Sequence, residues 1–235
     1  ISGAYVEYEN KIGSLEYKAG IRAEYTGIEI DDLENTFTQN KYYLNWFPSA
    51  FLSYALSETS NLQASYSRRI NRPFLWDIYP FYEIRDINVL QIGNPDLNPT
   101  YTDGFELSYS LRKEKISVNP GVYYRNSSQP LQTFLQQASD DLFVLQPINI
   151  DQLKETGVEL NLRYQPSRVF QFTTDFNYYQ FEDIGTFAGQ DLFASGTTWR
   201  VRTSAQARLP KELRLQATYL YTAPRNEAQL NYLSY

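Results

Sequence analysis

Apolar and polar residues alternate with a period of two along most of this chain. In the stretch 15–25, for example, Leu15 and Tyr17 alternate with Glu16 and Lys18. Alternation sustained over this length indicates a β-strand whose two faces meet different surroundings. Similar runs recur at 4–10, 50–56, 62–67, 105–112, 115–125, 158–165, 170–178, 199–209 and 213–221.

The length and the polar face of these runs indicate strands that cross a membrane. Most runs last about 9 to 15 residues, whereas strands of water-soluble proteins average about 5–6 and tilted membrane strands need about 9–11. The polar face carries Glu, Arg and Lys at successive positions, as in Glu159 with Arg163 and Arg200 with Arg202. Such a face suits a water-filled or plugged lumen, where opposite charges on neighbouring strands can pair.

The connections between runs alternate between short and long. Short turns are expected at 12–14, 58–61, 113–114, 166–167 and 210–212, and long connections at 27–41, 71–103, 126–152, 182–195 and from 224 onward. This sorting is typical of an outer-membrane barrel with short periplasmic turns and long extracellular loops. The fold class predicted is therefore an all-β, antiparallel, up-and-down transmembrane β-barrel.

One long connection is predicted to contain a hairpin of its own. Its arms are 131–137 and 142–147, and Asp140 with Asp141 forms the turn. The chain then supplies ten membrane strands, or twelve if the arms of this hairpin enter the membrane. Both interpretations preserve the up-and-down order.

The period-two pattern also predicts which side chains face lipid. The expected outward set is Tyr109, Leu111, Val118, Leu160, Leu162, Phe172, Phe176, Val201 and Leu215. The expected luminal set is Glu106, Arg112, Glu159, Arg163, Asp175, Arg202 and Arg214. Because a shift of one residue in register exchanges the two faces, the two sets test the membrane interpretation sharply.

The composition agrees with a barrel and narrows the function. The chain has 235 residues with 21 Tyr, 14 Phe and 3 Trp, and a mean hydropathy of −0.50. Membrane barrels also have a polar mean hydropathy, because only alternate residues of each strand meet lipid. The formal net charge of −6 disfavours a nucleic-acid partner, and the absence of His and Cys excludes the commonest general base and the catalytic thiol. We therefore expect no enzyme, no cofactor and no metal site.

The segment 71–103 is aromatic, irregular and rich in proline, and is predicted to be a large extracellular loop. Pro95 and Pro99 push the residues before them into extended conformations. The side chains of Asp96 and Asn98 are expected to hold turns by bonding to local backbone. The next barrel strand is predicted to begin near Thr102.

Four aromatic residues of this loop are the candidate substrate-binding residues. They can form a platform at the extracellular mouth, where loops commonly bind ligands. The alternative is that they anchor the loop at the membrane interface, as aromatic girdles do. The four residues are Trp76, Tyr79, Phe81 and Tyr82.

Charged residues near the loops admit two interpretations each. Arg68 and Arg69 can bind an anionic substrate, or can pair with luminal carboxylates or plug residues near the wall, which we favour. Asp31, Asp32 and Glu34 have the hard oxygen ligands that Ca²⁺ prefers, but a solvated acidic loop explains them more simply.

Several segments together resemble the TonB-dependent receptor family. They are "SYSRRINRP" (65–73), "GNPDLNPTYTDGFELSYS" (93–110) and "TGVELNLRYQP" (156–166), supported by "YVEYENKIGSLEYKAGIRAEYT" (5–26) and "FPSAFLSYALS" (47–57). The likeness spans nearly the whole chain and is nearest to the outer-membrane barrel receptors of Bacteroidota. The residues taken as its structural motif are Arg68, Arg69, Pro73, Asn94, Pro95, Asp96, Leu97, Pro99 and Glu106.

The resemblance implies a 22-stranded barrel in the bacterial outer membrane, closed by an N-terminal plug and driven by TonB–ExbB–ExbD. The chain departs from that pattern, because residues 1–235 read as part of one barrel domain, without the plug, the segment that contacts TonB or the terminal strands. The implied partners are outer-membrane lipid, the TonB system through residues not in this chain, and a surface lipoprotein or other complex subunits.

Three functions are weighed. The leading one is uptake of a scarce, bulky nutrient such as an iron chelate, a cobalamin, a glycan or a peptide. The second is a structural or assembly barrel in an outer-membrane complex, and the third is a soluble all-β binding protein. We also expect the chain not to close on itself: its first strand near 4–10 should not pair with its last near 229–235.

Overall fold

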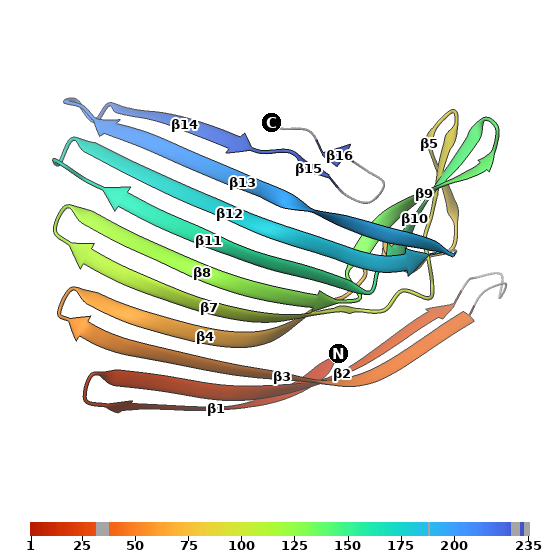
Figure 1. The fold of residues 1–235 in the computed structure, drawn as a ribbon, viewed down its shortest axis with the longest axis horizontal. Coiled ribbons are helices and arrows are strands. Elements are labelled where there is room, and N and C mark those ends of the chain that lie inside the picture. The colour runs from red at the N-terminus through yellow and green to blue at the C-terminus, as the bar shows by residue number, and fades with distance from the viewer. Residues whose placement is uncertain (32–37, 188, 227–230, 233–235) are drawn as a thin grey trace.

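The computed structural model describes residues 1–31, 38–187, 189–226 and 231–232. Its main feature is a ten-stranded sheet, which curves as one wall (Figure 1). In spatial order, the strands are β1 (Ser2–Ile12), β2 (Leu15–Asp31), β3 (Thr38–Ser57), β4 (Ser60–Asn71), β7 (Thr100–Lys113), β8 (Ile116–Ser128), β11 (Gln152–Tyr164), β12 (Phe170–Phe187), β13 (Gln190–Arg208) and β14 (Arg214–Thr222).

Every neighbouring pair in this sheet is antiparallel, and the sheet follows chain order once the loop strands are left aside. The prediction of an up-and-down arrangement is therefore confirmed. The strands are also long, from 9 residues in β14 to 20 in β3. Among the described residues no helix is long and apolar enough to span a membrane.

A second, four-stranded sheet lies at the end of the wall that carries the long connections (Figure 1). Its order is β5 (Tyr82–Asp86), β6 (Val89–Ile92), β10 (Leu142–Asn149) and β9 (Leu131–Ser139). The hairpin predicted from the sequence is β9 and β10, with its turn at Asp140 and Asp141. Because this hairpin pairs with β6 and not with the wall, ten strands is right and the alternative of twelve is wrong.

Two of the predicted long connections are instead mostly strand. Strands β12 and β13 stay paired as far as Phe187 and Gln190, so 182–195 is a long hairpin and not an open loop. Likewise β2 and β3 stay paired as far as Asp31 and Thr38, within the expected loop 27–41. These outer strand ends carry polar residues that suggested loops, but one face of each hairpin packs against loop residues, through Ile30 in β2 and Leu192 in β13.

The outer halves of β2 and β3 leave the wall. Strand β3 pairs with β4 only as far as Ser49 with Ser67, whereas β2 and β3 remain paired far beyond that point. We call the region where β3 and β4 part the seam. Backbone groups cannot be left unpaired in hydrocarbon, so a split of this kind belongs outside the lipid-facing part of the wall.

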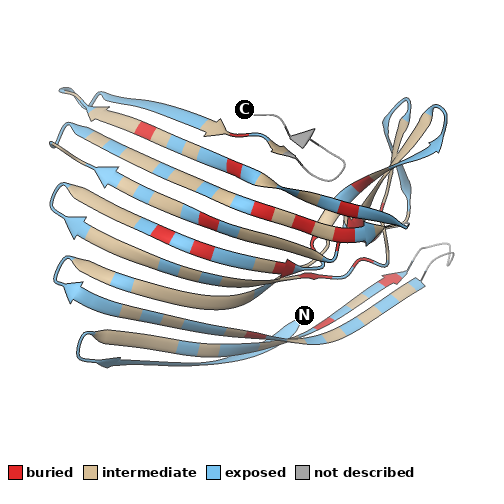
Figure 2. Cartoon of the chain, viewed as in Figure 1, coloured by how far each residue is buried: buried red, intermediate tan, exposed pale blue. Residues whose placement is uncertain are grey.

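Most buried residues lie toward the long-connection end (Figure 2). One cluster joins β9 and β10 to β12 and β13 through Phe134, Ile148 and Leu192. A second cluster, which we call the loop core, joins the β2–β3 hairpin to the loop through Ile30 and Leu97. These clusters fix the loops on the wall and shape its mouth.

The loop between β4 and β7 also contains a short helix, α1 (Leu75–Ile78). Gly93 lies against the backbone of this helix, where an added Cβ would come within 2.9 Å of the carbonyl oxygen of Trp76. The loop then returns to the wall, and β7 begins at Thr100, close to the predicted start near Thr102. The strands β5 and β6 within this loop had no counterpart in the sequence prediction.

The two edges of the main sheet are β1 and β14. In the part of the chain that the structure describes, no ladder joins them. The segment 229–235, expected to form the last strand, lies almost wholly outside the described residues. Of it, only the short strand β16 (Asn231–Tyr232) is described, paired with β15 (Arg225–Asn226) and not with β1.

Candidate functional site in the barrel lumen

The register gives the wall two chemically distinct faces. Directly paired residues share a face, and the pairs place every member of the predicted outward set on one face and every member of the luminal set on the other. Thus Leu160 pairs with Phe176 and Phe176 with Val201, whereas Asp175 pairs with Arg202. The predicted separation of the two sets onto opposite faces of the wall is confirmed.

Aromatic residues form a row on the outward face near the mouth. The rings of Tyr66 and Phe105 lie 4.8 Å apart between centroids, and those of Trp199 and Tyr221 lie 4.7 Å apart. Aromatic girdles of this kind sit at the membrane interface of outer-membrane barrels. The row therefore marks where the lipid-facing part of the wall ends.

Opposite charges pair across strands on the luminal face. The ammonium of Lys18 on β2 lies 3.0 Å from the carboxylate of Glu7 and 3.6 Å from that of Glu9, both on β1. Each of these side chains is about half exposed, so the pairs stabilise the wall weakly. Their importance is that they make the inner wall hydrophilic.

A groove crosses the luminal wall near the level of the aromatic row. Its floor consists of small residues that pair in one row across four strands: Gly20, Ser49, Ser67 and Gly104. The row begins next to Glu7 on β1 and ends next to Arg125 on β8. Side chains longer than serine would fill this space.

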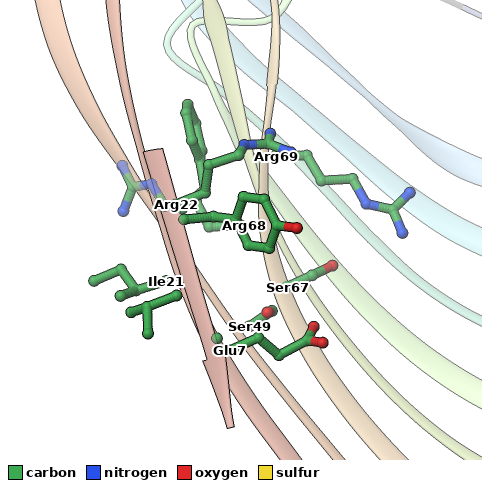
Figure 3. A pocket seen from close by; sticks show the side chains of 11 residues that line it. Glu7, Ile21, Arg22, Ser49, Ser67, Arg68 and Arg69 are labelled. Carbon is green, nitrogen blue, oxygen red and sulfur yellow. The ribbon is translucent and has the colours of Figure 1, made fainter. Parts of the chain in front are cut away.

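The groove contains two adjoining cavities, of about 400 and 350 Å³, which share Ser67 and Arg69. Figure 3 shows Glu7, Ser49 and Ser67 among the side chains that line the first cavity. The second cavity is lined by Glu106, Tyr123 and Arg125, among others. The groove thus offers hydroxyls, guanidinium groups and the carboxylates of Glu7 and Glu106 to a polar guest.

The two arginines Arg68 and Arg69 lie on opposite faces. Arg69 is luminal and lines both cavities, a position that agrees with both predicted interpretations. Arg68 pairs in register with Asp103, and its guanidinium lies 3.8 Å from that carboxylate, which also accepts a hydrogen bond from Tyr66. The expectation of a luminal partner for Arg68 is therefore wrong, because consecutive strand residues point to opposite sides.

A bulky aromatic ring lies flat along the inner wall farther along the sheet. Tyr123 on β8 passes over Gly157 on β11, and its hydroxyl bonds to Asn177 on β12. A Cβ at Gly157 would come within 2.6 Å of the Tyr123 ring and 2.7 Å of the carbonyl oxygen of Tyr178. Glycine is needed here because ring and backbone leave no space for a side chain.

The segment 94–99 ties the loop to its neighbours. The side chain of Asn94 accepts a hydrogen bond from the backbone N–H of Asp96 and donates one to the carbonyl of Pro147 on β10. Leu97 is 2% exposed in the loop core, and its carbonyl accepts a hydrogen bond from Lys41 on β3. Burial there lowers the pKa of Lys41, which lies on the hairpin half that has left the wall.

The side chain that holds the turn in this segment is Asn94, not Asp96 or Asn98 as expected. The backbone of Asn98 instead bonds twice to the amide side chain of Asn149, through its N–H and its carbonyl. Asn94 is placed better than Asp96 because its amide can accept and donate at once. Pro73, Pro95 and Pro99 line a narrow space against the loop core.

Arg72 bridges the seam. One of its guanidinium nitrogens lies 2.6 Å from the carboxylate of Glu24 and 3.1 Å from the hydroxyl of Thr26, both on β2. Tyr101 on β7 reaches across to the side chain of Asn45 on β3 at 2.8 Å. Side-chain contacts thus replace the missing backbone ladder between β3 and β4.

Arg225, which follows β14, makes a second buried contact over the inner wall. Its guanidinium lies 3.5 Å from a carboxylate oxygen of Glu155 and 3.4 Å from one of Asp183, whose side chain is 1% exposed. It also lies 4.4 Å from the centroid of the Phe181 ring. The chain after β14 is thereby held over β11 and β12.

Of the four predicted platform aromatics, the described structure shows a ring contact for Tyr79 and Phe81. Trp76 on α1 is 79% exposed and Tyr82 on β5 is 65% exposed. Tyr79 is half-buried against the loop core, and its ring lies 4.5 Å from that of Phe81. Phe81 is 46% exposed, so Trp76 and Tyr82 are the two most exposed members of the set.

Among the described residues there is no group of three or more metal-ligating side chains. Asp32 and Glu34 of the acidic loop considered for Ca²⁺ lie outside the described residues. The groove, the seam contacts and the Arg225 contact were missed by sequence reasoning, because each joins strands whose pairing the sequence does not state.

Comparison with solved structures gives the fold. The chain aligns over 99% of its length with the ferric enterobactin receptor PfeA of Pseudomonas aeruginosa (a G324V mutant), at 13% identity and a TM-score of 0.62. It aligns over 99% of its length with the copper transporter OprC, at 14% identity and a TM-score of 0.67. It aligns over 94% of its length with the FrpB iron transporter of Neisseria meningitidis, at 16% identity and a TM-score of 0.63. The alignments cover 35%, 37% and 32% of those chains.

The chain therefore spans about a third of the length of the receptors and transporters it resembles. No curated protein sequence matches it. A model of the outer membrane protein beta-barrel family matches residues 1–235. This match agrees with the ten antiparallel strands, the apolar outward face and the charged inner face, and it confirms the outer-membrane location predicted from the sequence. The chain belongs to the outer membrane β-barrel protein family.

Proposed function

We propose that this chain forms part of the barrel wall of a receptor that takes up a scarce, bulky nutrient across the outer membrane. The observation that supports this most is the inner wall: a charged lumen with a groove of two cavities, below a mouth built from packed loops. The candidate nutrients are an iron chelate, a cobalamin, a glycan or a peptide. The iron and copper receptors with similar folds favour metal-bearing compounds.

The same proposal includes a larger barrel. The two sheet edges carry rows of backbone groups that hydrocarbon does not tolerate unpaired, so further strands would complete the wall. A plug inside the lumen would contact the charged inner wall. TonB–ExbB–ExbD would supply energy through residues outside this chain, and long loops would face the cell exterior.

Uptake by intact cells tests the proposal. Strains with and without the full-length protein would be given each nutrient class, with and without an uncoupler of the proton motive force. We expect protein-dependent uptake of one class that the uncoupler abolishes. Uptake that is independent of the protein for every class, or insensitive to the uncoupler, would contradict the proposal.

A loop variant tests the assigned contacts within that experiment. Replacing Trp76 and Tyr82 together with Ala should raise the nutrient concentration needed for half-maximal uptake, because both rings are exposed at the mouth. The control is Ile87→Ala, which changes an even more exposed apolar side chain, at 90%, of the same loop. If both variants raised the nutrient concentration for half-maximal uptake equally, Trp76 and Tyr82 would not be ligand-binding residues.

A structural or assembly subunit is the second candidate. It is favoured by β5, an edge strand whose five residues are all exposed and whose Ile84 side chain is 77% exposed. Edge strands with exposed apolar residues favour pairing with another chain, such as a surface lipoprotein. Affinity purification of the full-length protein should then recover a stable partner, and Ile84→Lys should release it.

A further inference from the structure

Three short stretches at the short-turn end of the wall are strongly basic. They are 112–115 at the β7–β8 turn, 163–168 at the β11–β12 turn and 208–214 at the β13–β14 turn. Together they hold eight of the chain's 21 lysines and arginines and only two of its 27 acidic residues. The chain as a whole has a formal net charge of −6, so this rim is a local reversal of sign.

None of these eight cations has a carboxylate partner among the residues that the structure describes. All eight side chains are exposed, and no ion pair within 4.0 Å involves any of them in the described part of the chain. The other short turns differ, since 13–14 is uncharged and 58–59 contains Glu58. The positive charge is therefore an arc over β7 to β14 and not a ring around the whole rim.

The eight cations divide into two equal sets. Four are luminal by register, and we call them the luminal set: Arg112, Arg163, Arg208 and Arg214. The other four lie in the turns or on the outward face, and we call them the turn set: Lys113, Lys115, Arg168 and Lys211. Both sets lie at the short-turn end of the wall and carry the same number of positive charges. Variants of one set can therefore serve as controls for variants of the other.

The turn set lies where lipid headgroups must be. Lys113 shares the outward face with Leu111 and pairs with Ile116, so it follows directly on the apolar surface that faces lipid. The outward residues Tyr164 and Phe172 end the same surface beside the next turn. A hollow of about 480 Å³ lies between the two turns. It is lined by Lys113 and Lys115 of the turn set, by Arg112 and Arg163 of the luminal set and by Glu114, so it adjoins both sets.

We propose that the turn set binds the phosphate groups of anionic phospholipids in the leaflet at the short-turn end of the wall. Lysine and arginine donate charge-assisted hydrogen bonds to phosphate oxygens, and basic side chains near an anionic membrane surface add to its attraction. An acidic protein segment entering the lumen would instead engage the luminal set. The proposal depends on the outer-membrane location alone and not on which nutrient the barrel takes up.

The test uses the full-length protein in lipid nanodiscs that contain phosphatidylcholine alone or a mixture with phosphatidylglycerol. Native mass spectrometry would measure the phosphatidylglycerol retained per protein, relative to phosphatidylcholine. Three proteins would be compared: the wild type, a turn variant with the four turn-set residues changed to Gln, and a luminal variant with the four luminal-set residues changed to Gln. Correct folding of each would be checked by its resistance to unfolding in detergent.

We expect the wild type and the luminal variant to retain more phosphatidylglycerol than phosphatidylcholine. In the turn variant, the ratio of retained phosphatidylglycerol to phosphatidylcholine should fall by about tenfold or more. High salt should weaken the preference, because the contacts are exposed. Added inorganic phosphate at equal concentration should not displace the lipid. No preference in the wild type, an equal loss in the luminal variant, or full displacement by inorganic phosphate would overturn the proposal.

Discussion

At the scale of single residues, the inner wall depends on where side chains are small. The groove exists because glycine and serine pair in one row, and the ring of Tyr123 lies flat because Gly157 has no side chain. The sequence shows these residues as ordinary members of alternating strands. Which of them pair across strands is set by register, so their roles could not be predicted.

Gly157→Ala should destabilise the barrel by about 1–3 kcal/mol, because the new methyl group meets the Tyr123 ring and the backbone of Tyr178. Urea unfolding of the full-length protein in lipid vesicles would measure it. The control is Gly121→Ala on β8, where the nearest atom is the flexible side chain of Glu159 at 3.3 Å. Equal stability of the two variants would contradict the packing described for Tyr123.

Asn94→Ala should loosen the loop without loosening the wall, because it removes one bond within the loop and one to Pro147. Hydrogen exchange should quicken at 93–99 and in β10 and stay unchanged in β12. Asp96→Ala is the control, since the neighbouring carboxylate is exposed and holds no turn. If backbone amides at 93–99 and in β10 exchange at the same rates in the two variants, the side chain of Asn94 does not hold the loop.

At the scale of elements, alternation predicted the ten wall strands and their two faces, because period-two patterning is a direct consequence of strand geometry. It underestimated β2, β3, β12 and β13, whose outer ends carry polar residues on both faces and resemble loops. It also missed β5, β6 and the seam. Those depend on contacts between segments far apart in the chain, which no local pattern encodes.

Arg72→Ala should free the outer half of β3 at the seam, because that half has no ladder to β4 and is held across the seam by side chains. Hydrogen exchange should quicken at 38–48 and remain slow at 49–57. Arg22→Ala is the matched control: Arg22 also contacts Glu24, at 2.9 Å, but from the same strand. Unchanged exchange at 38–48 in Arg72→Ala would mean that the loop core alone holds the hairpin.

At the scale of the whole molecule, the chain is a curved wall with lipid on one side and a charged lumen on the other. Composition and strand length predicted this class, since few other folds combine long alternating strands with charges on every polar face. The candidate site was predicted less well. Loop aromatics stand out in a sequence, whereas a groove made of small residues and a bridge made by Arg72 become visible only once the strands are aligned.

The most direct test of this account is site-directed spin labelling along β12 of the full-length protein in lipid bilayers. The described chain contains no cysteine, so single cysteines can be placed one at a time from 172 to 177. We predict that collisions with dissolved oxygen, which concentrates in lipid, are frequent at the three even-numbered positions, 172, 174 and 176, and rare at the three odd-numbered positions, 173, 175 and 177. Oxygen collisions that peak instead at Thr173, Asp175 and Asn177, or that do not alternate, would contradict it.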